Sequence, residues 1–537
     1  MNKENNDIAL FKKTISSMVV RKISYYRVIV SLCLFMFLLS PVFGDEISAV
    51  SFDKELSENN IVTIQPDSLR ILHNPLTGWV LYASMGVDAA DFWAQYDHMY
   101  IPELGHNVSV TDYAHTLYIR ASWTDFNPQE DVYGWKIDSN LRAYIEGAYQ
   151  RNMRLAFRVV VDSRDKRTEF TPQFVKDAGA KGFMNKSKWS PYSDDPVFQK
   201  YYTKFVKALA KDFNDPSKVE FIDGFGLGKW GEYHTMIYST GDDTPKKAVF
   251  DWVTDIYSQA FDKVPVVINY HRWIGAGKDW VDDEHFAADS EEMLEEAIKK
   301  GYSLRHDAFG MTTYYGSWER RFAEKYRNIC PIIMEGGWIV KSHNYWQDPR
   351  GYRKDSHEDV RRGEFDDSKE AHVNMMDFRF GDTESWFKDA FDLVRRFLRE
   401  GGYRLYPSEI SLPLEVSKKT TPTIKHCWNN LGWGYCPTNI PQWNQKYKVA
   451  FALLDSETNE VRYTFVDTDT DLSKWIKGSP AEYVFEPDMS KVETGTYVWA
   501  VGLVDRSNKD LVGLDIAAKG DILDSGWLKL SKVSINK

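Results

Sequence analysis

The chain has 537 residues, 43% of them hydrophobic, so it can bury a large core and form more than one domain. Its formal net charge is −11, with no Lys/Arg-rich tract outside the N-terminal region, so it lacks the electrostatic footprint of a nucleic-acid-binding protein. The GxxxxGK[ST] phosphate cradle of nucleotide-hydrolysing enzymes is also absent from the sequence.

The N-terminal region has the order of a secretory signal peptide. Basic residues at positions 12, 13, 21, 22 and 27 precede the uncharged run VIVSLCLFMFLLSPVFG, which ends at Gly44. A signal peptide over residues 1–44 predicts a protein that is secreted, periplasmic or at the cell surface, without stable membrane insertion after cleavage. The run of 17 residues is also just long enough for an uncleaved membrane anchor, so that alternative stays open.

Eight apolar, β-branched and aromatic runs follow, at residues 75–84, 115–123, 154–163, 219–227, 264–271, 306–316, 330–338 and 403–409. They lack clean alternation, as expected of strands that are buried on both faces. Segments with helical periodicity precede several of them and end in Gly or Asn. This order predicts an α/β fold, a (β/α)₈ TIM barrel over residues 45–409, with a doubly wound open sheet as the alternative.

The sequence pattern changes near residue 410. Short runs such as EVRYTFVD and GTYVWAVGLVD are separated by turn residues, and no long helical periodicity remains. This pattern predicts a smaller C-terminal β-sandwich over residues 410–537. Cys427 and Cys436 are close enough in sequence to form a disulfide in an oxidising compartment.

Reactive groups of such a barrel come from the carboxyl ends of its strands. The polar and aromatic residues at those ends are, in strand order, Arg120; Arg158 and Asp162; Trp230, Glu232 and His234; Asn269 and His271; Tyr314; and Glu335 and Trp338. Glu232 follows the fourth strand and Glu335 ends the seventh. Carboxyl groups at these two places can meet across the barrel mouth, where a glycoside hydrolase needs one protonated and one ionised carboxyl group.

We therefore interpret Glu232 and Glu335 as a catalytic pair, although either alone could be a loop acid or a salt-bridge partner. Arg120 is expected to orient Glu335, and Tyr314 to donate a hydrogen bond to it. The other residues are candidate sugar contacts: Arg158, Asp162, His234, Asn269 and His271 as polar partners, and Trp230 and Trp338 as stacking platforms. Carboxylates alone perform this chemistry, so we expect a carbohydrate substrate, no metal ion and no cofactor. The sequence does not predict an oligomeric state.

The stretch LYIRASWTDFNPQEDVYGWKID, residues 117–138, resembles a segment after the second strand of clan A glycoside hydrolases, family 42 β-galactosidases in particular. The resemblance implies an acid/base at strand four and a nucleophile at strand seven, where Glu232 and Glu335 fall. The whole pattern also resembles bacterial secreted proteins in which such a barrel precedes a β-sandwich, the domain of unknown function 4832. In that comparison HCWNNLGWGYC, residues 426–436, is similar to the start of the sandwich.

One position departs from the clan. Its members usually carry Asn before the strand-four glutamate, to bind the sugar 2-hydroxyl, whereas Gly231 stands there in this chain. The turn GLGKWGE is also similar to that of β-amylases, which invert configuration, so retention is favoured but inversion stays open. Two other functions remain: a non-catalytic glycan-binding surface protein with a degenerate barrel, or an adhesive protein acting through its sandwich.

Overall fold

The computed structural model describes residues 59–537 except 84, 165–167, 278–283, 312–313, 338–355 and 380. The described residues belong to one compact unit. The predicted signal peptide, residues 1–44, lies outside them, as does Trp338. Within the described ranges, every helix is too short or too polar to cross a membrane.

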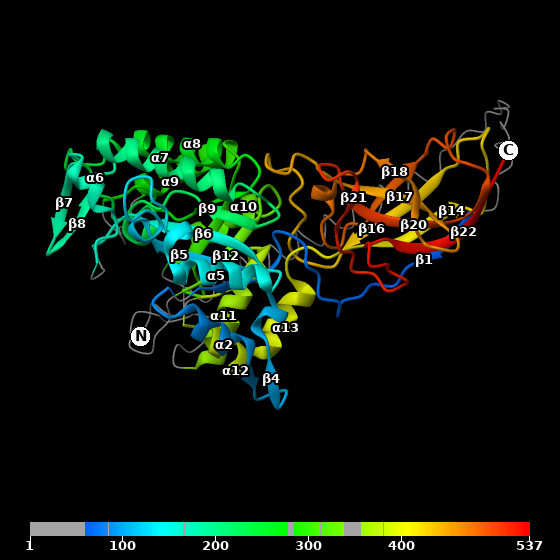
Figure 1. The fold of residues 1–537 in the computed structure, drawn as a ribbon, viewed down its shortest axis with the longest axis horizontal. Helices are drawn as coiled ribbons and strands as arrows, with labels where there is room; N and C mark the ends of the chain where they lie inside the picture. Colours follow the sequence, from blue (N-terminus) through cyan, green and yellow to red (C-terminus); the bar gives the residue numbers. More distant parts are fainter. Residues whose placement is uncertain are drawn as a thin grey trace, which may run out of the picture. The chain divides into compact units, whose positions relative to one another are not determined.

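Parallel strands close into an eight-stranded barrel, which confirms the predicted fold class (Figure 1). In chain order they are β2 (Gly78–Tyr82), β5 (Ala114–Ser122), β6 (Arg154–Val160), β9 (Val219–Asp223), β10 (Val266–Asn269), β11 (Tyr302–Phe309), β12 (Ile332–Gly336) and β13 (Met375–Phe378). Every residue of β2, β9, β10, β12 and β13 is buried. Burial on both faces explains why these strands have no alternating pattern.

The prediction that residues 403–409 form the eighth barrel strand was wrong. Residues Leu405–Pro413 form β14, which pairs antiparallel with β1 (Asn59–Thr63) and β16 (Ile424–Asn430) outside the barrel. The barrel closes instead through β13, which pairs with β12 and β2. Its four residues, MMDF, follow a highly charged helix, α11 (His357–Glu370), and are too few for a periodic signal.

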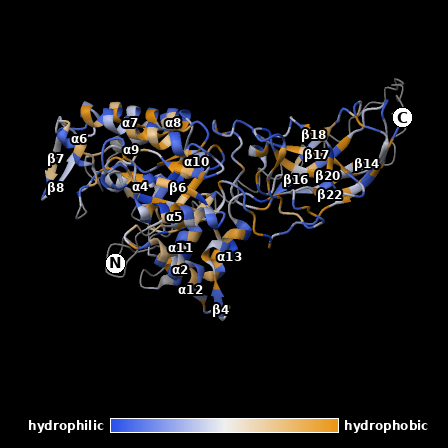
Figure 2. Cartoon of the chain, viewed as in Figure 1, coloured by the Kyte–Doolittle hydropathy of each residue, from blue (hydrophilic) through white to orange (hydrophobic). Residues whose placement is uncertain are grey.

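Amphipathic helices surround the barrel (Figures 1 and 2). They include α5 (Ser139–Gln150), α7 (Pro196–Phe213), α8 (Lys246–Ala260), α9 (Glu284–Lys299), α10 (Ser317–Tyr326) and α13 (Phe391–Glu400). The longest, α7, is capped by Asp195, whose carboxylate accepts hydrogen bonds from the main-chain N–H groups of Val197 and Phe198 at 3.0 and 2.9 Å. Pro196 occupies its first turn, where the missing N–H group costs nothing.

Two largely antiparallel sheets follow the barrel. One has the order β1-β14-β16-β19 (Ala481–Phe485). The other has the order β15 (Glu415–Ser417), β22 (Leu528–Asn536), β20 (Gly495–Asp505), β17 (Tyr447–Asp455) and β18 (Val461–Asp467), with β21 (Leu511–Leu514) on β20. The first sheet takes β1 from before the barrel, and residue 410 lies inside β14, so these strands come from both sides of the predicted domain boundary. The expected Cys427–Cys436 disulfide is absent; both thiols are free.

The C-terminal sheets pack against the amino-terminal end of the barrel strands. One hydrophobic cluster joins barrel-interior residues such as Phe221 and Val267 to sandwich residues such as Trp428 and Phe451. The Asn374 amide, before β13, donates to the carbonyls of Leu76 and Tyr435 at 3.1 and 2.9 Å. This end of the barrel is therefore filled with side chains, so the opposite, carboxyl end is where a site can open.

Trp433 tests how tightly barrel and sandwich depend on each other. Its side chain is buried, its indole N–H donates to the Val373 carbonyl at 2.9 Å, and its ring packs edge-on to Phe365 at 5.4 Å. Trp433→Ala is expected to lower the free energy of unfolding by about 3 to 5 kcal/mol, because it opens a cavity between the two parts. Urea denaturation followed by circular dichroism and fluorescence measures this loss.

The matched control is Val484→Ala, at a side chain that is 62% exposed, with an expected change within about 0.5 kcal/mol. Two separate unfolding transitions in the parent protein, with Trp433→Ala leaving the barrel transition unchanged, would contradict the coupling.

Candidate active site

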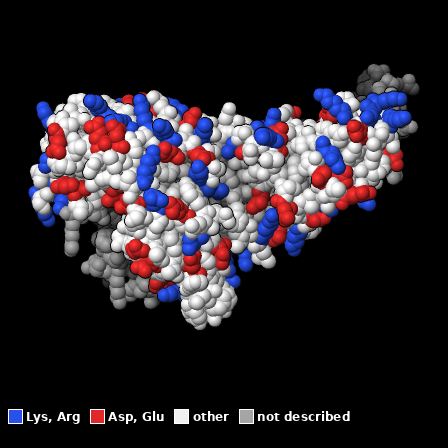
Figure 3. Space-filling view, in the orientation of Figure 1, with Lys and Arg blue, Asp and Glu red and all other residues white. Residues whose placement is uncertain are grey.

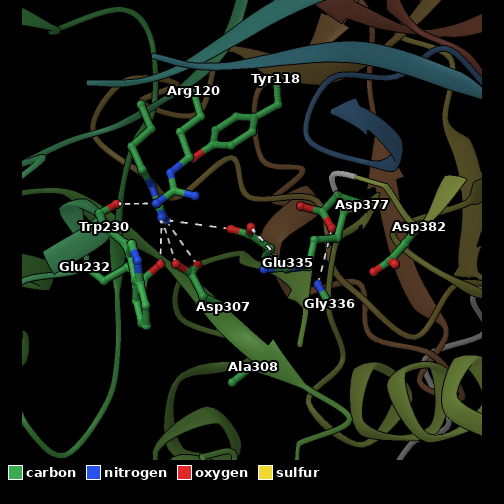
Figure 4. A network of polar contacts seen from close by, with 12 residues as sticks. Tyr118, Arg120, Trp230, Glu232, Asp307, Ala308, Glu335, Gly336, Asp377 and Asp382 are labelled. Carbon is green, nitrogen blue, oxygen red and sulfur yellow. Dashed lines mark hydrogen bonds and ion pairs between the residues drawn. The ribbon is translucent and has the colours of Figure 1, made fainter. Parts of the chain in front are cut away.

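A layer of charged side chains lies at the carboxyl ends of the barrel strands (Figure 4). Its members are Arg158 on β6, Asp223 on β9, Glu232 after β9, Arg305 and Asp307 on β11, Glu335 on β12 and Asp377 on β13. Arg305 and Asp307 are two residues apart on β11, so both side chains lie on the same face of the strand. The strand register places Arg158 beside Asp223, which brings side chains distant in sequence into one layer.

Arg158 is the centre of this layer. Its guanidinium is fully buried and donates to Asp223 at 2.6 Å, to the two carboxylate oxygens of Asp307 at 2.8 and 3.1 Å, and to Glu232 at 3.3 Å. A fourth carboxylate, that of Glu335, lies 3.9 Å from Nη2. In Figure 4 the carboxyl groups of Glu232 and Asp307 lie side by side, and Glu335 points toward them. One cation thus connects both predicted catalytic glutamates.

Glu335 has its own arginine. Arg305 Nη1 donates to Glu335 Oε2, and Arg305 Nη2 donates to Asp377 at 3.2 Å. Arg379 Nε lies 4.0 Å from the other oxygen of Glu335. The carboxylate therefore faces three guanidinium groups, those of Arg305, Arg158 and Arg379.

The loop after β9, which carries Glu232, contains residues in the left-handed backbone conformation. Gly226 has φ +67°, and a Cβ there would lie 2.0 Å from the Val159 carbonyl oxygen, so only glycine fits. His234 Nε2 lies 3.2 Å from Glu232 Oε2, and His271 Nε2 lies 2.7 Å from the main-chain oxygen of Glu232. Both histidines predicted as sugar contacts thus contact Glu232, His234 at its carboxyl group and His271 at its main-chain oxygen.

Burial and neighbouring charges separate the protonation states of the carboxyl groups. Burial, with the Asp307 charge second, raises the pKa of Glu232 to about 7. Burial alone would also raise the pKa of Asp307, but the guanidiniums of Arg158 and Arg305 hold it well below its ordinary value. Near neutral pH the pair can therefore carry a proton on Glu232 and a negative charge on Asp307.

Glu335 and Asp377 form a second pair of carboxyl groups whose pKa values depend on each other. Burial raises the pKa of Glu335, while Arg305 and Arg158 oppose that rise. Burial and the nearby Glu335 carboxylate raise the pKa of Asp377 well above its ordinary value. Of these two carboxyl groups, Asp377 therefore has the stronger tendency to hold a proton, while the arginines favour the ionised form of Glu335.

Other predicted residues have different partners. Arg120 Nη2 donates to the main-chain carbonyl of Trp230 at 2.9 Å, and the arginine that donates to the Glu335 carboxylate is Arg305. Arg120 still interacts with Glu335 through its charge. Asp162 pairs with Arg164 at 2.6 Å and accepts from Ser190 at 3.2 Å, so it holds the loop after β6.

The predicted stacking and hydrogen-bonding groups lie around the mouth. Lys229 Nζ lies 4.0 Å from the ring centroid of Trp230, so one face of this predicted platform is already covered by an ammonium group. Tyr314 packs on Ala308 and Met311, next to β11. The buried Asn269 Oδ1, at the end of β10, accepts no hydrogen bond from the described residues. Trp338, the second platform, lies outside the described residues.

Sequence reasoning missed Arg305, Asp307, Asp223 and Asp377. The sixth strand was predicted to begin at residue 306, but β11 begins at Tyr302, so its two charged residues were placed at the wrong end. Asp377 was missed together with its strand, β13. Charged residues within an otherwise buried strand were the available signal, because each needs a partner inside the barrel.

On the face shown in Figure 3, the basic and acidic side chains of the described residues are interspersed. That face therefore has no extended positive patch that would attract a polyanion such as a nucleic acid.

Neither a protein-family model nor a curated protein matches this chain. Similar solved structures include the endo-β-1,4-mannanase from Thermotoga petrophila, at 13% identity and a TM-score of 0.38 over 87% of this chain and 99% of that one. A GH30 endoxylanase from Clostridium papyrosolvens C71 has 9% identity and a TM-score of 0.37 over 78% and 96% of the two chains. Endo-glycoceramidase II from Rhodococcus sp. has 12% identity and a TM-score of 0.36 over 79% and 99%. Similarities this low do not bear on activity, so the interpretation of the site rests on its own geometry.

Proposed function

We propose that this protein is a glycoside hydrolase in which Glu232 is the acid/base and Glu335 the nucleophile. The observation that carries the proposal is their convergence on one buried guanidinium, with Arg158 nitrogens 3.3 Å from Glu232 and 3.9 Å from Glu335. Contact with a single guanidinium keeps the two carboxyl groups within about 9.5 Å of each other, the upper end of the range glycoside hydrolases use. One of them holds a proton near neutral pH, and the other faces three arginines.

The proposed reaction follows from these two states. Glu232 gives its proton to the glycosidic oxygen while a Glu335 oxygen attacks the anomeric carbon, so the C–O bond breaks and a glycosyl ester forms. The ionised Glu232 then takes a proton from water, which attacks the ester and releases Glu335. In an inverting enzyme, Glu335 would instead activate water directly.

The substrate and the location of the protein are parts of the same proposal. The clan A resemblance favours a β-linked oligo- or polysaccharide, β-galactosides in particular, and the predicted signal peptide favours export. Export is tested by N-terminal sequencing of protein recovered from outside the cytoplasm. The expected result is a chain that begins at Asp45.

The acid/base role is tested with Glu232→Gln on a panel of aryl glycosides and oligosaccharides. We expect kcat to fall by about 10²- to 10⁴-fold on oligosaccharides, because the leaving oxygen then departs without a proton. The loss should be much smaller on substrates with an acidic phenol as leaving group, since these need little protonation. Initial rates with both substrate classes measure the difference.

Glu400→Gln is the matched control. Glu400 lies at the end of α13, pairs with Arg396 at 3.0 Å on the surface, and should keep parental activity. Equal kcat values for Glu232→Gln and the parent on oligosaccharides would remove Glu232 from the mechanism.

The second candidate is a glycan-binding protein without catalysis. Gly231 supports it: with φ +79° and a Cβ contact of 3.3 Å to the Gly226 Cα atom, this position disfavours the Asn that clan A uses. Calorimetric binding of a glycan that stays intact after long incubation with the protein would favour this reading over hydrolysis.

A further inference from the structure

Asp307 is a third carboxyl group next to the proposed catalytic pair. It lies on β11, two residues after Arg305, and its carboxyl group lies beside that of Glu232, with Arg158 Nη1 donating to both at 2.8 and 3.3 Å (Figure 4). Its side chain is 9% exposed and that of Glu232 14%, whereas the side chain of Glu335 is 4% exposed. The two more accessible carboxyl groups of this trio therefore share one guanidinium nitrogen, Arg158 Nη1.

The donors around this pair are divided unequally. Asp307 accepts from Arg158 Nη1 and Nη2 at 2.8 and 3.1 Å and from Arg305 Nη1 at 2.5 Å. From the two arginines Glu232 accepts a single, longer contact, from Arg158 Nη1 at 3.3 Å, and its other oxygen lies 3.2 Å from His234 Nε2. Charge-assisted hydrogen bonds stabilise the ionised form of the group that accepts them. The arginines thus favour the negative charge on Asp307, and the shared proton falls to Glu232.

We propose that Asp307 is a positioning residue that retains the acid proton on Glu232 and so sets the upper pH limit of the reaction. This inference rests on the proposed function for its effect on catalysis, but the location of the proton does not depend on turnover. Asp307 makes no bond to the sugar in this role; it acts through Glu232.

Other charged groups also face Glu232 and must be weighed. Arg158 from β6 and Arg120 from β5 favour its ionised form, His234 Nε2 lies 3.2 Å from its Oε2, and Glu335 lies across Arg158. His271 Nε2, after the end of β10, lies 2.7 Å from its main-chain oxygen. Asp307 is the acidic group that lies beside the Glu232 carboxyl, so its removal should have the largest effect on the proton.

The test is Asp307→Asn, which keeps the size of the side chain and removes its charge. Arg158 is then free to turn toward Glu232, so Glu232 should ionise at lower pH. We expect the basic limb of the kcat/KM pH profile to move to lower pH by about one unit or more. Asp307→Glu, which restores the charge, should bring the limb back toward the parental position.

An infrared pH titration locates the proton without any turnover. The parent should show a protonated carboxyl C=O band that disappears near neutral pH and is missing in Glu232→Gln. In Asp307→Asn that band should disappear at lower pH. This measurement separates the two proposals, because it decides the position of the proton even if no glycan is hydrolysed.

The matched control is Asp367→Asn. Asp367 is a buried carboxylate on α11 that accepts from Arg320 at 2.6 Å and from the Gly310 N–H at 2.9 Å, away from Glu232. Its loss tests general damage around β11 and should leave the infrared titration unchanged. An unmoved band and pH limb in Asp307→Asn, or the same shift in Asp367→Asn, would overturn the proposal.

Discussion

Glu335→Gln is expected to reduce kcat by about 10⁴-fold or more, the scale on which removal of a covalent nucleophile acts. The carboxylate lies near the end of β12 and faces Arg305, Arg158 and Arg379, whose charges oppose the rise in its pKa that burial causes. The amide is nearly the same size but cannot form a glycosyl ester. Steady-state rates on the best substrate of the panel measure the loss, with Glu400→Gln as the surface control.

A 2-deoxy-2-fluoro glycoside carrying a good leaving group makes this test specific. If the enzyme retains configuration, the sugar should become attached to the peptide that contains Glu335, and mass spectrometry should find the adduct there. Hydrolysis without an adduct, and with inverted product, would make Glu335 a general base. An adduct on Asp307 would move the nucleophile from β12 to β11.

Local sequence patterns were sufficient to locate most of the barrel strands and to place the two glutamates at strand ends. Strands buried on both faces produce long apolar runs, and seven of the predicted runs overlap barrel strands of the described structure. The end of a strand is also a local property, so Glu232 and Glu335 could be assigned to strands four and seven before any contact was known. His234, two residues after Glu232, followed from the same reasoning and does contact it.

Contacts set by register across the barrel could not be predicted in this way. Arg305 pairs with Glu335 on one neighbouring strand and reaches Asp377 on the next, and neither pairing has a signature along the chain. Arg120 was predicted to hold Glu335 because both lie at strand ends, yet its guanidinium donates to the Trp230 carbonyl. Which arginine meets which carboxylate depends on strand order and stagger, which a single sequence does not encode locally.

The same limit explains the errors at the edges of the barrel. Residues 403–409 look like a barrel strand because their apolar side chains are mostly buried, but the partners of β14 are β1 and β16. β1 lies more than 300 residues from β14 in sequence, so no local pattern could reveal their pairing. A short strand such as β13 becomes visible only when the barrel closes on it.

Arg158→Met is expected to lower the free energy of unfolding by about 3 to 5 kcal/mol at pH 7 to 8. The fully buried guanidinium contacts Asp223, Asp307 and Glu232, and its loss leaves buried carboxylates without their main cation. In the parent, the low pKa of Asp307 contributes stability above the pKa of the unfolded chain, and that contribution is lost as the pH falls. In the variant the pKa of Asp307 rises, so the carboxylate opposes folding at neutral pH. The difference between parent and variant should therefore shrink toward pH 4.

Urea denaturation at pH 4, 6 and 8 measures this dependence. Arg142→Met is the control: this arginine pairs with Glu146 on the surface at 3.1 Å, is 50% exposed, and should change the free energy by no more than about 0.5 kcal/mol. The double variant Arg158→Met/Asp307→Asn removes a buried carboxylate together with the cation, so it should lose less than the sum of the single variants. Additive losses, or a loss for Arg158→Met that is the same at all three pH values, would show that Arg158 stabilises the barrel by packing rather than by holding the charges of Asp307 and Glu232.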